Sequence, residues 1–101
     1  MARHTEAMER VAEAILETPG DANAELRQAV EAFAAGRADE LPENLRPFVE
    51  KVTKNAYKVV DADIDRLREA GYSDDAIFEL TLAAALGAAR MRLDAGLAAM
   101  R

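Results

Sequence analysis

The sequence predicts an all-α fold, a bundle of about five helices with a long C-terminal helix. Three observations predict it. Alanine accounts for 23 of the 101 residues, and alanine is the best helix former. Aromatic residues make up only 5% of the chain, too little bulk to fill a thick β-sandwich. Apolar residues recur at three- and four-residue steps in every long segment, as they do on one face of an α-helix.

The first two helices are expected over residues 5–17 and 23–35. Asp21 or Asn23 can cap the second helix, because a short polar side chain accepts a hydrogen bond from the first turn. Gly36 lies where a residue in the left-handed conformation ends a helix. Together these elements predict a helical hairpin over residues 1–36.

The third helix is expected over residues 44–56, with Pro47 near its first turn, where proline is tolerated. Residues 57–60 are expected to form an extended connector. Asp61 is expected to cap a fourth helix, and Gly71 to end it in the left-handed conformation.

The last helix is expected from Asp74 to about Ala99, capped by Ser73. At 1.5 Å per residue it is about 39 Å long, which spans a domain of this size. It therefore either kinks at Gly87 or packs on another subunit. Its apolar residues fall on two faces, which favours a central helix or a partner-facing one. The alternative is packing inside the domain alone.

The third, fourth and last helices form a second unit over residues 41–101. This unit and the hairpin over residues 1–36 are expected to form one domain over 1–101. We expect a homo-oligomer through the small residues of the last helix. The expected contact residues are Ala84, Gly87, Ala88 and Met91.

Composition excludes several classes of site. The chain has no Cys and one His, so disulfides, thiolate metal sites, cysteine nucleophiles and multi-histidine metal sites are excluded within one chain. The net charge is −6 and the pI about 4.8, which argues against a general nucleic-acid binder. The uncharged run over residues 80–89 is far shorter than the roughly 20 residues a bilayer requires. We expect no metal, no cofactor, no membrane span and a cytoplasmic location.

Three stretches resemble a known family. They read LRPFVEKVT over residues 45–53, VVDADI over 59–64 and LREAGYSDDAIFE over 67–79. With the alanines at 83–85 and a partial echo in Arg92-Leu93-Asp94, they resemble the C-terminal part of the alkylhydroperoxidase D-like family, which includes carboxymuconolactone decarboxylases. The resemblance implies an all-helical bundle, here with a three-helix core, that commonly forms homo-oligomers.

The chain departs from that family at the catalytic residues. Peroxidases of the family carry a Cys-x-x-Cys pair followed by a His, and the paired thiols reduce the hydroperoxide. This chain has no Cys, and its single histidine is His4. No catalytic residue of the family can be placed on this sequence, so the resemblance implies the fold and not thiol peroxidase activity.

The candidate site residues are Glu79, Arg90 and Arg92. Glu79 lies among apolar residues, where burial can raise the pKa of a carboxyl and make it a general base. Either arginine can hold a substrate carboxylate. A surface carboxylate and a routine helix ion pair between Arg90 and Asp94 are the simpler interpretations.

Other patterns have simpler structural explanations. Lys51, Lys54 and Lys58 form a basic stripe, which is typical of a solvated helix face. The alternating aspartates at 61, 63 and 65 faintly resemble a calcium loop, but helix capping explains them. The corner over 67–81 resembles a helix-turn-helix, but acidic residues begin its second helix.

The sequence therefore favours a non-catalytic structural or interaction protein that self-assembles. The first alternative is a small-molecule enzyme of the carboxymuconolactone decarboxylase type, using acid–base chemistry without thiols. The second is a subunit partner of a separate redox or DNA-binding protein. An apolar cleft in which Glu79 and an arginine converge would favour the enzyme.

Overall fold

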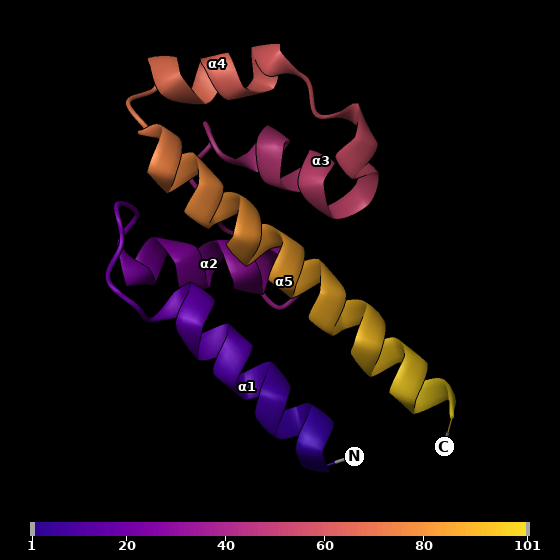
Figure 1. Ribbon diagram of the computed structural model, residues 1–101. Coiled ribbons are helices and arrows are strands. Elements are labelled where there is room, and N and C mark those ends of the chain that lie inside the picture. Colours follow the sequence, from indigo (N-terminus) through magenta and orange to yellow (C-terminus); the bar gives the residue numbers. More distant parts are fainter. Residues whose placement is uncertain (1, 101) are drawn as a thin grey trace.

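The computed structural model describes residues 2–100, with side chains from Glu6 to Met100. Over those residues it contains five α-helices, one short 3₁₀ helix and no strand, which confirms the expected all-α fold. Figure 1 shows the long last helix running across the molecule, with the middle three α-helices around its first half and the N-terminal helix beside its second half. The elements are α1 Ala2–Leu16, α2 Ala24–Ala34, α3 Arg46–Asn55, η1 Ala56–Lys58, α4 Asp61–Glu69 and α5 Asp74–Ala99.

Most of the expected helix ends are confirmed. Asn23 and Ser73 cap α2 and α5, each accepting a hydrogen bond from the backbone N–H three residues on, at 2.7 and 3.0 Å. Gly36 and Gly71 have φ angles of 79° and 102°. Both glycines close Schellman turns after their helices, which side chains other than glycine would strain.

Three local expectations were wrong. Helix α1 begins at Ala2, earlier than residue 5. Residues 56–58 form η1, so only the last two residues of the expected connector are extended. Asp61 is the first residue of α4 and not its cap. Val60 is the N-cap residue, and Asp63, the third residue of α4, accepts a hydrogen bond from the Val60 N–H through its Oδ2 at 2.9 Å.

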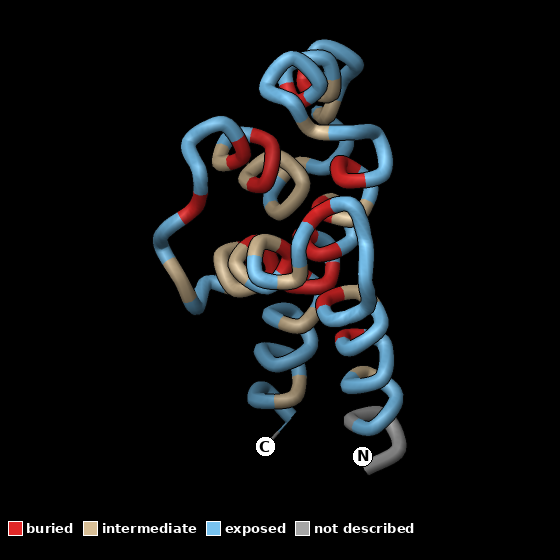
Figure 2. The backbone as a smooth tube through the Cα atoms, turned by 90° about the vertical axis from the view of Figure 1, so that its left-hand side faces the viewer, coloured by how far each residue is buried: buried red, intermediate tan, exposed pale blue. Residues whose placement is uncertain are grey.

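Two helices extend beyond the rest of the molecule. Figure 2 shows α1 and the last turns of α5 projecting side by side, largely exposed, with the two chain ends at the same end of the structure. The longest dimension of the molecule is 45 Å. Helix α5 is one continuous helix through Gly87, where a kink was one of the two expected alternatives. No helix over residues 2–100 is long and apolar enough to span a membrane.

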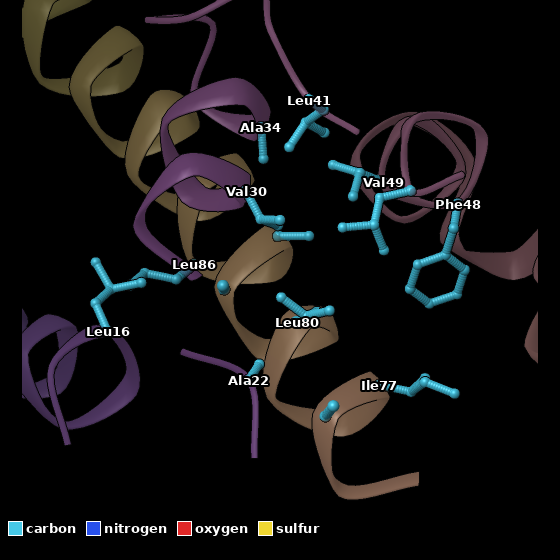
Figure 3. Packing of buried hydrophobic residues seen from close by; sticks show 14 of the residues in the cluster. Leu16, Ala22, Val30, Ala34, Leu41, Phe48, Val49, Ile77, Leu80 and Leu86 are labelled. Carbon is cyan, nitrogen blue, oxygen red and sulfur yellow. The ribbon is translucent and has the colours of Figure 1, made fainter. Parts of the chain in front are cut away.

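The hydrophobic core lies around the first half of α5. Figure 3 shows Leu80 of α5 facing Val30 of α2 and Val49 of α3. All three side chains are completely buried. Helix α2 makes its most extensive contacts with α5 rather than with α1. The expected N-terminal hairpin therefore packs by laying its second helix across the long one.

Helices α2 and α5 approach most closely at Gly87. A Cβ atom at Gly87 would lie 2.3 Å from the Glu31 carbonyl oxygen and 2.9 Å from the Ala34 Cβ. Both distances are well below van der Waals contact, so only glycine fits without a shift of the α2 backbone.

A buried arginine fixes the end of α1 to α2. Arg27 is 3% exposed, and its guanidinium donates hydrogen bonds to the carbonyl oxygens of Ile15 at 2.7 Å, Ala22 at 3.0 Å and Thr18. The carbonyls at the C-terminal end of a helix lack intrahelical partners and carry partial negative charge. At the end of α1, Arg27 supplies both the missing hydrogen-bond donors and a positive charge.

Helices α3 and α4 are joined by a lysine and a buried aspartate. Lys51 Nζ lies 2.9 and 3.0 Å from the two carboxylate oxygens of Asp63, whose side chain is 5% exposed. The hydrogen bond from Lys51 lowers the pKa of Asp63 below its ordinary value, and the Val60 N–H adds to the effect.

We expect Gly87→Ala to lower the free energy of unfolding by about 1–3 kcal/mol, since overpacking outweighs a helix-propensity gain of about 1 kcal/mol. Gly96→Ala is the matched control in the same helix, because nothing lies within 4 Å of its added Cβ. We expect the control to raise stability by about 0.5–1 kcal/mol. Chemical denaturation of dilute protein measures both, and equal effects would contradict the close approach.

We expect Asp63→Asn to remove a pH-dependent stabilisation. The pKa of Asp63 is lowered on folding from an ordinary value of 3.8, so its carboxylate stabilises the fold above that value. This contribution is lost as pH falls through the lowered pKa. The difference in Tm between wild type and variant should be largest at neutral pH and shrink as the pH falls through the lowered pKa. Asp61→Asn, at an exposed position of the same helix turn, should show no comparable difference.

Candidate functional site

Glu79 holds the loop between α1 and α2 against α5. Its two carboxylate oxygens accept hydrogen bonds from the backbone N–H groups of Ala22 at 2.8 Å and Asp21 at 3.1 Å. The loop also passes so close that a Cβ at Gly20 would lie 2.6 Å from the carboxylate. Ser73 donates a further hydrogen bond to the Asp21 carboxylate at 2.9 Å. The Glu79 carboxylate is therefore engaged with the fold.

Arg90 lies between two carboxylates. Its Nη2 is 3.3 Å from Glu9 Oε1 on α1, and its Nη1 is 3.8 Å from Glu31 Oε2 on α2. The Glu31 side chain is only 4% exposed, and its other oxygen pairs with Arg37 after the end of α2. Arg90 thus links α1, α2 and α5, and its charge is already offset on two sides.

Glu31 is the one buried polar group of this region that sequence reasoning missed. By its sequence, the more apolar face of this helix is that of Leu26, Ala29, Val30 and Phe33. The face that is buried consists of Arg27, Val30, Glu31 and Ala34. Both faces have helical spacing, and the buried one is the less apolar of the two. The available signal was the position of two charged residues one turn apart beside Val30. Hydrophobicity alone favours the other face of α2.

Arg92 caps a different helix. Its Nη2 donates a hydrogen bond at 2.8 Å to the carbonyl oxygen of Thr53, in the last turn of α3. A cation is favourable there because the C-terminal carbonyls of a helix carry partial negative charge. Like Arg27, Arg92 donates a hydrogen bond to a carbonyl oxygen at the C-terminal end of a helix.

The three candidate residues do not converge on one site. Glu79 and Arg90 are eleven residues apart on α5, which places them about 16 Å apart along the helix axis. Each faces a different neighbour, and Arg92 faces a third. The arrangement that acid–base catalysis by these residues would require is absent from the described side chains.

Three of the four residues expected at an oligomer contact are buried within the single chain. Ala84, Gly87 and Ala88 are buried inside the chain, where α2 crosses α5. Their small size serves the packing of these two helices. Met91 is 41% exposed and lies past the end of that contact.

An apolar groove separates α1 from the second half of α5, between the two projecting helices of Figure 2. Its volume is about 840 Å³. Val11, Leu82 and Leu93 line it and are each more than a third exposed. The polar lining residues are Glu9, Arg90 and Asp94. The rest of the lining consists of Ala7, Met8, Ile15, Ala85, Leu86, Ala89 and Leu97.

The remaining sequence candidates have structural partners or lie outside the description. Lys51 of the basic stripe pairs with Asp63, and Lys58 lies over the ring of Tyr57. Among the residues described, no group of three or more His, Asp or Glu is placed to hold a metal ion. The side chain of His4 lies outside the described residues.

Comparisons with known proteins found no match: no protein-family model, curated protein or solved structure matches this chain. The resemblance to the alkylhydroperoxidase D-like family therefore rests on the stretches quoted above and stays a prediction.

We expect Glu79→Ala to lower the free energy of unfolding by about 1–2 kcal/mol, because two backbone N–H groups lose a charged acceptor. The amides of Asp21 and Ala22 should also exchange with solvent faster than in wild type, by native-state hydrogen exchange. Glu13→Ala removes an exposed carboxylate from α1 and is the control. Unchanged exchange at both amides in Glu79→Ala would contradict the role of this carboxylate in holding the loop.

Proposed function

We propose that this chain is a non-catalytic protein that acts by association, assembling with copies of itself as a structural or interaction protein. The single observation that carries the proposal is the uncovered apolar groove between α1 and α5. Moving apolar side chains out of water lowers the free energy by roughly 25 cal/mol for each Å² buried. Large exposed apolar patches bordered by polar residues mark interaction sites.

The last turns of α5 support the same proposal. From Ala89 to Ala99, every residue except Arg90 and Leu97 is exposed. An isolated helix of this length is marginal in water, because helix stability in proteins comes mostly from packing. A partner on this segment would supply the packing that the single chain does not.

The proposal includes a relationship to the alkylhydroperoxidase D-like family, as a relative that lacks the Cys-x-x-Cys pair, and a cytoplasmic location. Support for the relationship is the resemblance over residues 41–97. What it predicts is helical architecture and self-assembly. Thiol-dependent reduction of a hydroperoxide by the pure protein would contradict the non-catalytic part of the proposal.

The enzyme alternative is less well supported by the geometry. Arg90 lines the groove, where it could meet a substrate carboxylate. Two carboxylates, those of Glu9 and Glu31, already face it and would repel a second anion. Glu79 is engaged elsewhere, so the expected general base does not accompany Arg90 in the groove.

We expect the protein to form a discrete oligomer whose population rises with concentration, as measured by native mass spectrometry and light scattering. Leu93→Glu should weaken association at least about 100-fold, because each copy loses a buried leucine and gains a charge in the groove. Ala95→Glu places the same charge on an exposed position of α5 outside the groove and is the control. A wild-type protein that stays monomeric at high micromolar concentration would overturn the proposal. A stoichiometric bound small molecule would point instead to a ligand site.

A further inference from the structure

Residues 6–11, in the first half of α1, have few contacts with the rest of the molecule. Met8 is their one partly buried side chain, and the others are exposed. Burial begins at Ala12 and Leu16, and the hydrogen bonds from Arg27 lie at the far end of the helix. A segment with few buried contacts opens locally at a low cost in free energy. Residues 6–11 are therefore a weakly docked flap at the free end of an anchored helix.

A single ion pair joins this flap to α5. Among the described side chains of residues 6–11, only Glu9 makes an ion pair or hydrogen bond to another helix. Its partner is Arg90, at 3.3 Å. The Glu9 side chain is 65% exposed, so dissolved salt can reach and screen this pair.

Arg90 is held from its inner side by a buried charge. Its Nη1 lies 3.8 Å from Glu31 Oε2, and that oxygen is buried without a hydrogen-bond donor among the described residues. Salt screens the attraction of a buried carboxylate much less than that of an exposed one. The guanidinium thus stays anchored at α2 while its other nitrogen faces α1.

We propose that the Glu9–Arg90 pair is a salt-sensitive clasp that closes the flap against α5. With the clasp closed, Met8 and Val11 line the apolar groove. With the clasp open, the groove loses that part of its α1 wall. Ionic strength then controls how much of the groove exists. The inference concerns the single chain, so it goes beyond the proposed self-assembly and does not depend on it.

The size of the effect is set by the exposure of the pair. An exposed ion pair shifts an equilibrium by no more than about 5-fold, so the clasp matters only where the remaining docking is weak. The flap meets this condition, because Met8 is its one partly buried side chain. The second half of α1 does not meet it, since Ala12 and Leu16 are buried there.

Native-state hydrogen exchange of dilute, monomeric protein tests the clasp. In Glu9→Gln the amides of residues 8–11 should exchange about 2- to 5-fold faster than in wild type at low ionic strength. Raising the salt from about 0.01 M to about 1 M shortens the Debye length from about 30 Å to about 3 Å. The same increase in exchange should then appear in wild type, with no further change in Glu9→Gln. Glu13→Gln removes an exposed carboxylate one turn along the same helix and is the matched control.

A distance measurement locates the opening. The chain has no cysteine, so spin labels can be placed at Arg10→Cys and Ala95→Cys, which are both exposed and outside the groove lining. The distance between them should lengthen and its distribution broaden in about 1 M salt. Labels at Glu17→Cys, directly after α1, and at Ala95→Cys should keep their distance, because Arg27 holds that end of the helix.

The outcomes decide the inference without reference to self-assembly. Faster exchange over residues 8–11 in Glu9→Gln and in wild type at high salt, with Glu13→Gln behaving like wild type, supports the clasp. Equal exchange in Glu9→Gln and wild type at low salt overturns it. A salt response of the same size in both proteins also overturns it. Native mass spectra at higher concentration test oligomer formation separately, so either proposal can fail alone.

Discussion

The close approach of α2 to α5 at Gly87 is the constraint on which the rest of the structure depends. The carbonyl oxygen of Glu31 occupies the space in which any other residue at 87 would carry its Cβ. This contact brings Val30 and Ala34 against the long helix and sets where the core lies. It also draws the side chain of Glu31 into the interior, where Arg37 and Arg90 must face it. The lack of a Cβ at Gly87 thus positions both the apolar core and the main ionic network.

The buried and half-buried polar groups mostly serve helix ends and loops. Arg27 binds the carbonyls at the end of α1, and Arg92 binds one at the end of α3. Glu79 binds two amides of the loop before α2. Helix ends leave backbone groups without partners, and these side chains satisfy some of them. Glu79 and Arg92, which look catalytic in the sequence, are engaged in this way, which is why our proposed function rests on an apolar surface instead.

Helix α5 is apolar on two sides, and the single chain covers one of them. Its first half packs against α2 and α3 on one side through Leu80 and its neighbours. The other side, from Phe78 onward, contacts nothing comparable in the single chain. A helix of 26 residues is longer than the core it crosses, so its last turns extend past that core beside α1. The groove between them follows from this difference in length.

The sequence by itself determined the helices. Periodicity, the Asn23 and Ser73 caps and the glycines at 36 and 71 are local signals, because each acts within one helical turn. Only the tertiary structure decided which faces are buried. Arg27 and Glu31 were missed as buried residues, since their burial depends on partners far away in the chain. The small residues of α5 were compatible with an oligomer contact or with packing inside the chain. In the structure, Ala84, Gly87 and Ala88 are buried where α2 crosses α5. Local chemistry fixes where helices begin and end, whereas packing between distant segments fixes what their side chains do.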